Sequence, residues 1–413
     1  MGGKVMGRYL NSSTSYVLYK GQTEQPYFVD KSQMLSELFP FLDSGNTHIC
    51  ITRPRRFGKT VMANMITAFL GKKQDSDSIF KSLKISQNDL YNKYRNQYNV
   101  ISIDFSKMPR DCDSYTDYID RIETNLIRDL RKEYPQIEIY EDDSAADVLE
   151  TIFEECDQQR FVFVLDEWDF IFHKDFVTEE NKKQYVLFLS NLLKDRSYVQ
   201  LTYMTGILPI AKYSSGSELN MFWEYTMASE AKYNEYFGFT DSEVDQLYEK
   251  YTRNTREIYI SREDLKEWYD GYTTKSGERM YNPRSVVLAL TNNNIGNYWT
   301  SSGPYDEIFY YIRQNIDDVQ NDLALMISGE AVTAKIQEYA AVSMNLTTKN
   351  EIFSAMIVYG FLSYENGEVR IPNKELMNKF DDMIQKEERL GYVYQLAKES
   401  ERMLKATLAG NTK

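Results

Sequence analysis

The sequence of 413 residues predicts an α/β protein with a doubly wound, mainly parallel sheet, followed by a mainly helical part. Short apolar runs alternate with helical patterns in the first part of the chain, as they do when crossover helices connect parallel strands. The run Phe161–Leu165 is apolar without interruption, as expected of a strand buried on both faces. After about residue 240, helical periodicity dominates.

Two of the predicted helices begin with recognisable signals. A basic turn follows the first strand and leads into a helix with apolar positions from Val61 to Phe69. Ser144, with Asp147 three residues later, has the spacing of a helix N-terminal cap. The predicted strands, in chain order, are His48–Thr52, Val100–Phe105, Phe161–Leu165, Gln200–Thr205 and Phe222–Met227.

The later part of the chain combines helices with one hairpin. Asp241–Tyr251 and Ser261–Tyr269 are amphipathic helical segments, and another helical face contains Ile352–Ile357. Asn366-Gly367 between two alternating stretches favours a tight hairpin turn. Helices followed by a small hairpin predict a winged-helix-like unit, and the charged segment Asp381–Leu408 is predicted to be helical.

These patterns divide the chain into four predicted parts. Residues 1–239 form the α/β domain and residues 240–300 a helical lid. Residues 301–380 form the helical, winged-helix-like domain, and residues 381–413 a helical segment that is expected to connect to a further domain.

Composition excludes several classes of protein. The formal net charge of -14 argues against a basic nucleic-acid footprint spread over the surface. Three cysteines and two histidines are too few for a disulfide framework or a cysteine-rich zinc site, and they nearly exclude histidine-based triads. Apolar runs fall far short of the roughly 20 residues of a membrane span, so we expect no membrane partner and a cytoplasmic location.

The strongest local signal is the stretch Thr52–Thr60 between a predicted strand and a helix. In a phosphate-binding loop, backbone amides cradle the phosphates, a lysine reaches the terminal ones and a hydroxyl binds Mg²⁺. The first glycine of that pattern is replaced by Arg53, so a polar helix start remains an alternative. The residues we predict to bind nucleotide are Arg55, Arg56, Phe57, Gly58, Lys59 and Thr60.

A second element raises the odds of a nucleotide site. Asp166 and Glu167 follow directly on the apolar run, at the carboxyl end of a buried strand. Asp166 and Thr60 are the predicted Mg²⁺ ligands, and Glu167 would orient and polarise a water against the terminal phosphate. Thr205, at the end of the next strand, is predicted to contact that water or the phosphate. A strand that ends in solvated acids is the alternative.

Seven ordered blocks resemble the bacterial and archaeal AAA-ATPase-like proteins, whose longer members carry a C-terminal PD-(D/E)XK nuclease-like domain. The resemblance implies a P-loop ATPase with an additional sheet strand, a catalytic glutamate at Glu167 and a helical lid. No nuclease motif follows, so nuclease activity is not expected. The blocks are Tyr27–Ser32, Thr52–Thr60, Leu165–Asp169, Met204–Lys212, Phe237–Thr240, Trp268–Tyr272 and Tyr281–Pro283, of which Asn282 and Pro283 are expected to start a helix.

The sequence is compatible with three functions. The first is ATP hydrolysis with Mg²⁺, coupled to a movement of the lid. The second is a nucleotide-binding switch or scaffold with little turnover, acting on a protein partner or by self-association. The third is a nucleic-acid-binding module in the winged-helix-like region, although Phe361–Lys379 is not strongly basic.

Overall fold

The computed structural model describes residues 7–210, 217–227, 230–300, 316–336, 348–385 and 403. The chain forms two compact units. Unit 1 comprises Met1–Thr52 and Gly58–Thr226, and unit 2 comprises Arg53–Phe57 and Met227–Lys413. The four-part division predicted above stays a prediction.

Unit 1 is built on a five-stranded sheet in the order β2-β3-β4-β1-β5. Every pairing in it is parallel, which confirms the predicted α/β class. β4 separates β1 from β3, so the additional strand implied by the resemblance is present. The strands are β1 (Thr47–Thr52), β2 (Asn99–Asp104), β3 (Phe161–Asp166), β4 (Val199–Gly206) and β5 (Phe222–Tyr225).

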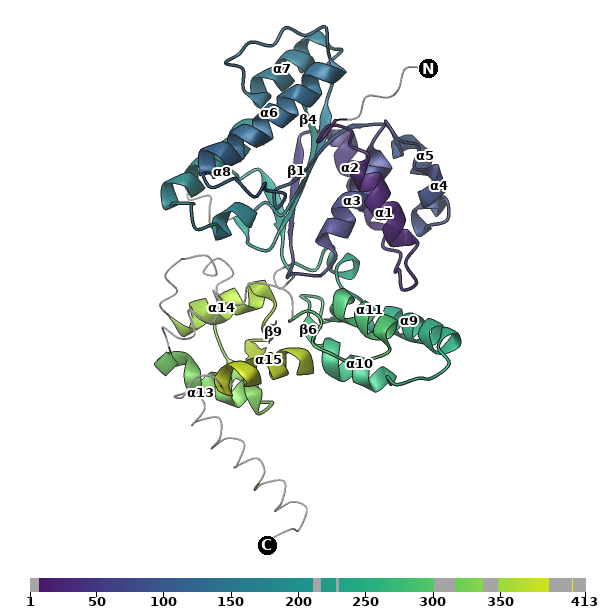
Figure 1. Ribbon diagram of the computed structural model, residues 1–413, viewed down its shortest axis with the longest axis vertical. Coiled ribbons are helices and arrows are strands. Elements are labelled where there is room, and N and C mark those ends of the chain that lie inside the picture. The colour runs from purple at the N-terminus through teal and green to yellow at the C-terminus, as the bar shows by residue number, and fades with distance from the viewer. Residues whose placement is uncertain are drawn as a thin grey trace. The chain divides into compact units, whose positions relative to one another are not determined.

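Helices cover both faces of this sheet, as a doubly wound arrangement requires. In Figure 1, α1, α2 and α3 lie on one side of the sheet and α6 and α8 on the other. Side-chain caps start α7 at Ser144 and α8 at Thr178, and each belongs to a reciprocal capping box. The helices of unit 1 are α1 (Thr14–Thr23), α2 (Met34–Ser44), α3 (Lys59–Leu70), α4 (Asp77–Phe80), α5 (Tyr91–Tyr94), α6 (Tyr115–Glu133), α7 (Ala145–Glu155) and α8 (Glu179–Leu193).

A short N-terminal segment covers the β2 edge of the sheet. Leu10 forms an antiparallel bridge with Ile101, and the Asn11 amide donates to the Val100 carbonyl at 2.8 Å. The Asp129 carboxylate on α6 accepts from the Leu10 amide at 3.2 Å. Backbone groups on this side of β2 are therefore paired, which protects the edge from pairing with other chains.

The described residues of unit 2 form helices and two small antiparallel sheets. β6 pairs with β7, and the other sheet has the order β8-β10-β9. The predicted hairpin is confirmed, because Asn366 (φ 52°) and Gly367 (φ 91°) connect β9 to β10. The elements are α9 (Asp241–Asn254), α10 (Arg262–Tyr269), β6 (Tyr272–Thr273), β7 (Arg279–Met280), α11 (Pro283–Asn292), α13 (Ile316–Ile327), β8 (Val332–Thr333), α14 (Lys349–Tyr359), β9 (Ser363–Glu365), β10 (Glu368–Arg370) and α15 (Lys374–Gln385).

Two predicted features of unit 2 lie partly or almost entirely outside the described residues. The winged-helix assignment of residues 301–380 stays a prediction, since part of that region lies outside the described residues. The predicted helix Asp381–Leu408 lies almost entirely outside them as well, although α15 extends to Gln385.

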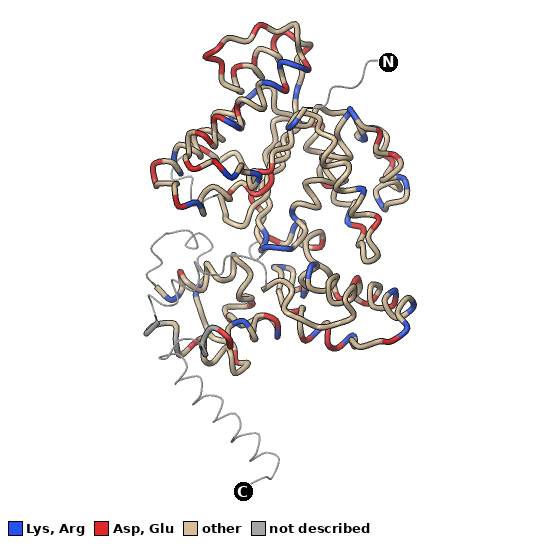
Figure 2. Tube along the Cα trace, viewed as in Figure 1, with Lys and Arg blue, Asp and Glu red and all other residues tan. Residues whose placement is uncertain are grey.

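Charged residues of both signs are distributed over the helices (Figure 2). Figure 2 shows Asp and Glu interspersed with Lys and Arg along the helices of each unit. Among the helices in the described part of the chain, none combines the length and apolar character needed to cross a membrane.

Candidate nucleotide-binding site

The loop after β1 has the backbone of a phosphate-binding turn. Arg56 (φ 69°) and Gly58 (φ 91°) are left-handed, and α3 begins at Lys59. A Cβ atom built on Gly58 would meet nothing within 4 Å, so this glycine serves the turn's conformation and the space beside it is open. The first amides of α3 have no partner within the helix, which makes this end suited to anions.

Two residues of the loop are held in unit 2 by their side chains. Arg53, in the place of the pattern's first glycine, is buried and donates from Nη2 to Asn234 Oδ1 at 2.8 Å. Phe57 is 1% exposed, and the centroids of the Phe57 and Tyr272 rings are 4.9 Å apart in an edge-to-face contact. The Phe57 side chain is therefore core, and only its backbone is left to contact a nucleotide.

Asp166 ends β3 as a buried carboxylate, 4% exposed. The Thr205 hydroxyl on β4 donates to its Oδ1. Burial raises the pKa of the Asp166 carboxyl, while hydrogen bonds from Thr205 and Thr60 oppose that rise. The structure thus brings Thr60 and Asp166, the two predicted metal ligands, into hydrogen-bonding contact.

Glu167 follows Asp166 in a left-handed conformation (φ 54°), which is uncommon for a residue with a side chain. It is partly buried. Burial raises the pKa of the Glu167 carboxyl, the Lys59 ammonium opposes the rise, and the nearby Asp166 and Asp169 add to it. A carboxyl whose pKa moves toward neutrality is better suited to accept a proton from water.

The other predicted site residues are placed as follows. Thr205 is completely buried, and its described hydrogen bond is to Asp166. Arg55 is partly buried and Arg56 is exposed on the loop. Roles for these residues toward a nucleotide stay predictions.

Sequence reasoning missed two acids beside the site. Asp104 ends β2 and is the register partner of Asp166 on the neighbouring strand. Its charge adds to the pKa rise of both Asp166 and Glu167. Asp169 lies just beyond the acidic pair and is buried. An acid at the carboxyl end of a neighbouring parallel strand was a usable signal for Asp104, because those ends share one edge of the sheet.

The donor set fits a magnesium ion that is held mainly by its ligand's phosphates. The Thr60 hydroxyl and Asp166 carboxylate offer the oxygen atoms that Mg²⁺ prefers. Within the ranges that the structure describes, no group of three or more His, Cys, Asp or Glu could hold a metal ion unaided. One or two protein oxygens plus phosphates and water is the usual arrangement for Mg²⁺ with nucleotides.

Comparison with known proteins finds a family whose model matches the segment that contains these residues. Residues 19–215 match the model of a family described as AAA-ATPase-like, predicted AAA-ATPase. This segment is similar to that family. The match includes the loop, both acids and Thr205, so the resemblance inferred from the sequence is confirmed here. A relative from Azotobacter chroococcum mcd 1, an uncharacterized protein in the vnfD 5' region, is 24% identical over 284 residues.

That relative is the longer protein, since the alignment covers 67% of this chain and 51% of the relative. Among solved structures, the Walker-type ATPase PABY2304 of Pyrococcus abyssi aligns with a TM-score of 0.48 at 11% identity, covering 85% of this chain and 95% of that one. The ORC2 protein of Aeropyrum pernix, in its ADPNP-ADP complexes, aligns with a TM-score of 0.38 at 12% identity, covering 87% and 94%.

Proposed function

We propose that this protein binds ATP with Mg²⁺ at the loop before α3 and hydrolyses it, and that turnover is coupled to a conformational change. The observation that carries the proposal is the convergence of Lys59, Thr60, Asp166 and Glu167 at one edge of the unit 1 sheet. The family match over the same residues supports it.

Each residue has a role that follows from its chemistry. Lys59 and the first amides of α3 bind the phosphates, because the lysine carries a positive charge and the N-terminus of a helix attracts anions. Thr60 and Asp166 would hold Mg²⁺, which would supply positive charge to neutralise phosphate oxygens.

Glu167 then orients the attacking water and accepts its proton, a role favoured by a carboxyl whose pKa is raised by burial. Thr205 acts through Asp166, since its hydroxyl donates to that carboxylate. No covalent intermediate with the protein is required, because positioning and charge stabilisation are the main needs of phosphoryl transfer.

The two alternatives have less support. A switch with little turnover would bind nucleotide at the same loop but would have no need for Glu167. A nucleic-acid-binding module is not favoured at the β9–β10 hairpin, where Arg370 lies 3.3 Å from Glu368 and 4.0 Å from Glu365. Acidic groups outnumber basic ones there, which repels phosphate backbones.

Phosphate release and nucleotide affinity, measured on the same variants, test the proposal. Lys59→Ala should abolish binding, whereas Glu167→Gln should keep binding and lose phosphate release by about 10²–10⁴-fold. Lys183→Ala and Glu180→Gln, the same changes at exposed positions on α8, are the controls and should behave like the wild type. Negligible release from the wild-type protein would favour the switch instead.

A further inference from the structure

Asp169 holds the chain that follows β4. Asp169 is 3% exposed, and its Oδ2 accepts from the backbone amides of Ile207 at 3.0 Å and Leu208 at 2.9 Å. Hydrogen bonds to a charged acceptor are stronger than neutral ones. Two buried amides therefore depend on this one side chain.

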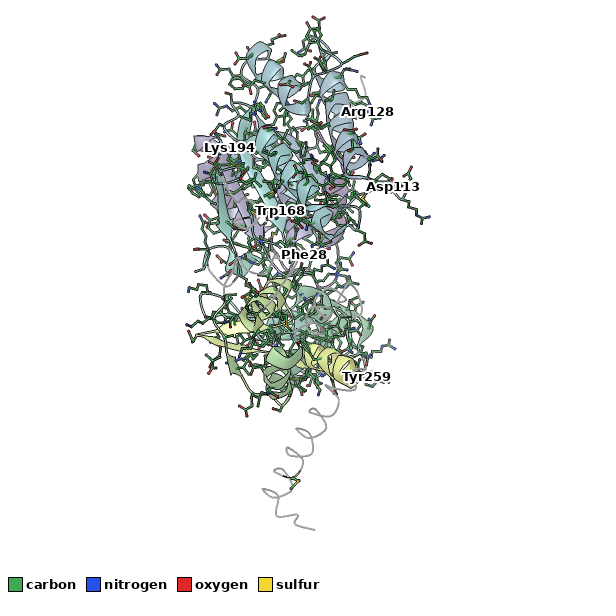
Figure 3. The ribbon with its side chains drawn as sticks, turned by 90° about the vertical axis from the view of Figure 1, so that its left-hand side faces the viewer. Phe28, Asp113, Arg128, Trp168, Lys194 and Tyr259 are labelled. Atoms are coloured by element: carbon green, nitrogen blue, oxygen red, sulfur yellow. The ribbon has the colours of Figure 1, made fainter. Side chains whose placement is uncertain are left out.

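Trp168 adds two more bonds to the same segment. It is completely buried within unit 1, where Figure 3 labels it. Its Nε1 donates to the Leu208 carbonyl at 3.1 Å, and its backbone amide donates to the Thr205 carbonyl at 3.0 Å. The Tyr185 hydroxyl on α8 donates to the Trp168 carbonyl at 2.8 Å, so this end of the arrangement is held in turn by a helix.

Gly206 shows how closely these groups approach the end of β4. A Cβ atom on Gly206 would lie 2.3 Å from Trp168 Cδ1 and 2.7 Å from Asp169 Oδ1. Only a residue without a side chain permits that approach. Trp168 and Asp169 therefore lie directly against the residue that follows Thr205.

Glu167 stands between two residues whose backbones are fixed. The Asp166 carbonyl accepts from the Phe105 amide at 3.0 Å, and the Trp168 amide is bonded to Thr205. Between them Glu167 keeps its left-handed conformation, which persists only where the surroundings impose it. The bonds of Trp168 and Asp169 are the surroundings on its C-terminal side.

We propose that Asp169 is a positioning residue for phosphate release, acting by clamping residues 205–208 against the end of β3. The clamp fixes the direction of the Glu167 side chain and the place of the Thr205 hydroxyl. This inference rests on the proposed hydrolysis at Glu167. Asp169 itself touches neither water nor phosphate in this role, so its loss should reduce kcat and spare nucleotide affinity.

The test compares Asp169→Ala, which removes both acceptor contacts, with Asp169→Asn, which keeps a carbonyl oxygen for the two amides. Exposed Asp113→Ala is the control for the chemical change. Three quantities are measured on the full chain: hydrogen exchange of the Ile207 and Leu208 amides, the Kd for ATP with Mg²⁺, and kcat for phosphate release.

Asp169→Ala should speed exchange at both amides and lower kcat by about 10²-fold, the typical effect of a misplacement of about 1 Å, with Kd changed less than about threefold. Asp169→Asn should recover most of kcat. Should Asp169→Ala not fold, Trp168→Phe removes only the Nε1 bond to Leu208 and should lower kcat by a smaller factor at unchanged Kd.

Two results would overturn the inference. One is faster amide exchange in Asp169→Ala with wild-type kcat, which would make the clamp irrelevant to turnover. The other is a loss of nucleotide affinity by the same factor as the loss of kcat, in both Asp169→Asn and Trp168→Phe. That result would mean that Asp169 has a structural role only. If the wild-type protein itself releases no phosphate, the proposed hydrolysis fails first and takes the positioning role with it.

Discussion

Asp166→Asn should make the nucleotide-free protein more stable and remove the additional stability that Mg²⁺ and ATP confer. Asp166 is a buried carboxyl whose pKa is raised mainly by burial. A carboxyl with a folded pKa above its unfolded value favours folding below the unfolded pKa, and that contribution is lost as pH rises through the folded pKa. Asparagine keeps an oxygen that accepts from Thr205 but carries no charge at any of these pH values.

The magnitude is a balance of two effects. Each unit by which the folded pKa exceeds the unfolded one costs about 1.4 kcal/mol at neutral pH. Against this, the bonds from the Thr205 and Thr60 hydroxyls weaken, because a hydrogen bond to a charged group contributes about 1.5–3 kcal/mol and a neutral one about 0.5–1.5 kcal/mol. Because burial outweighs these bonds in the net rise of the Asp166 pKa, we expect a net gain, and a gain of about 1 kcal/mol would raise the unfolding midpoint by about 2–4 °C.

Thermal denaturation at about pH 5 and about pH 8, with and without ATP and Mg²⁺, measures the stability of the nucleotide-free protein and the additional stability that the ligands confer. Without ligand, the variant's advantage should be larger at the higher pH, and ligand should raise the midpoint of the wild type only. Asp113→Asn, the same change on an exposed loop, is the control and should stay within about 0.5 kcal/mol of the wild type. A variant less stable than the wild type at the higher pH, or an advantage that shrinks as pH rises, would refute the reasoning.

Three substitutions test the packing of unit 2 by urea denaturation. Gly271→Ala should lower the free energy of unfolding by several kcal/mol, because Gly271 has φ 110° and a Cβ would lie 1.9 Å from the Pro372 carbonyl oxygen. Gly277→Ala, at φ 80° and with nothing near the added Cβ, should lower it by only about 1 kcal/mol. Equal costs at the two glycines would contradict the close approach. Phe57→Ala should cost about 3–5 kcal/mol, and a cost below about 1 kcal/mol would mean that the ring is not part of the core.

Local signals in the sequence located several elements of both units well. The predicted strand Phe161–Leu165 corresponds to β3, which includes one further residue, Asp166. A strand that is buried on both faces consists of consecutive apolar residues, so the end of the apolar run marks the end of the strand. Ser144 and Asp147 form the capping box that their spacing indicated, and Asn282 caps α11 with Pro283 in its first turn. These signals depend on neighbours within a few residues of each other.

The features that sequence reasoning missed depend on residues far apart in the chain. The bridge from Leu10 to Ile101 joins two segments that no local pattern relates. The packing of the Phe57 side chain in the core of unit 2 depends on residues much later in the chain, while its predicted contact with nucleotide stays a prediction. Asp169 was read only as part of a family block, since the two amides it accepts from follow a different strand.

The candidate site contains several departures from the usual conformational and burial preferences of amino acids. Arg56 and Glu167 are left-handed although they carry side chains, and Asp166 is a carboxylate buried beside other acids. Each departure costs free energy in the nucleotide-free protein, of order 1–3 kcal/mol for an unfavourable backbone conformation. A bound cation near Asp166 would offset the repulsion among the acids, whereas it would do nothing for an ordinary core carboxyl. Relief of this repulsion at Asp166 is therefore part of the stabilisation by ligand that Asp166→Asn is expected to remove.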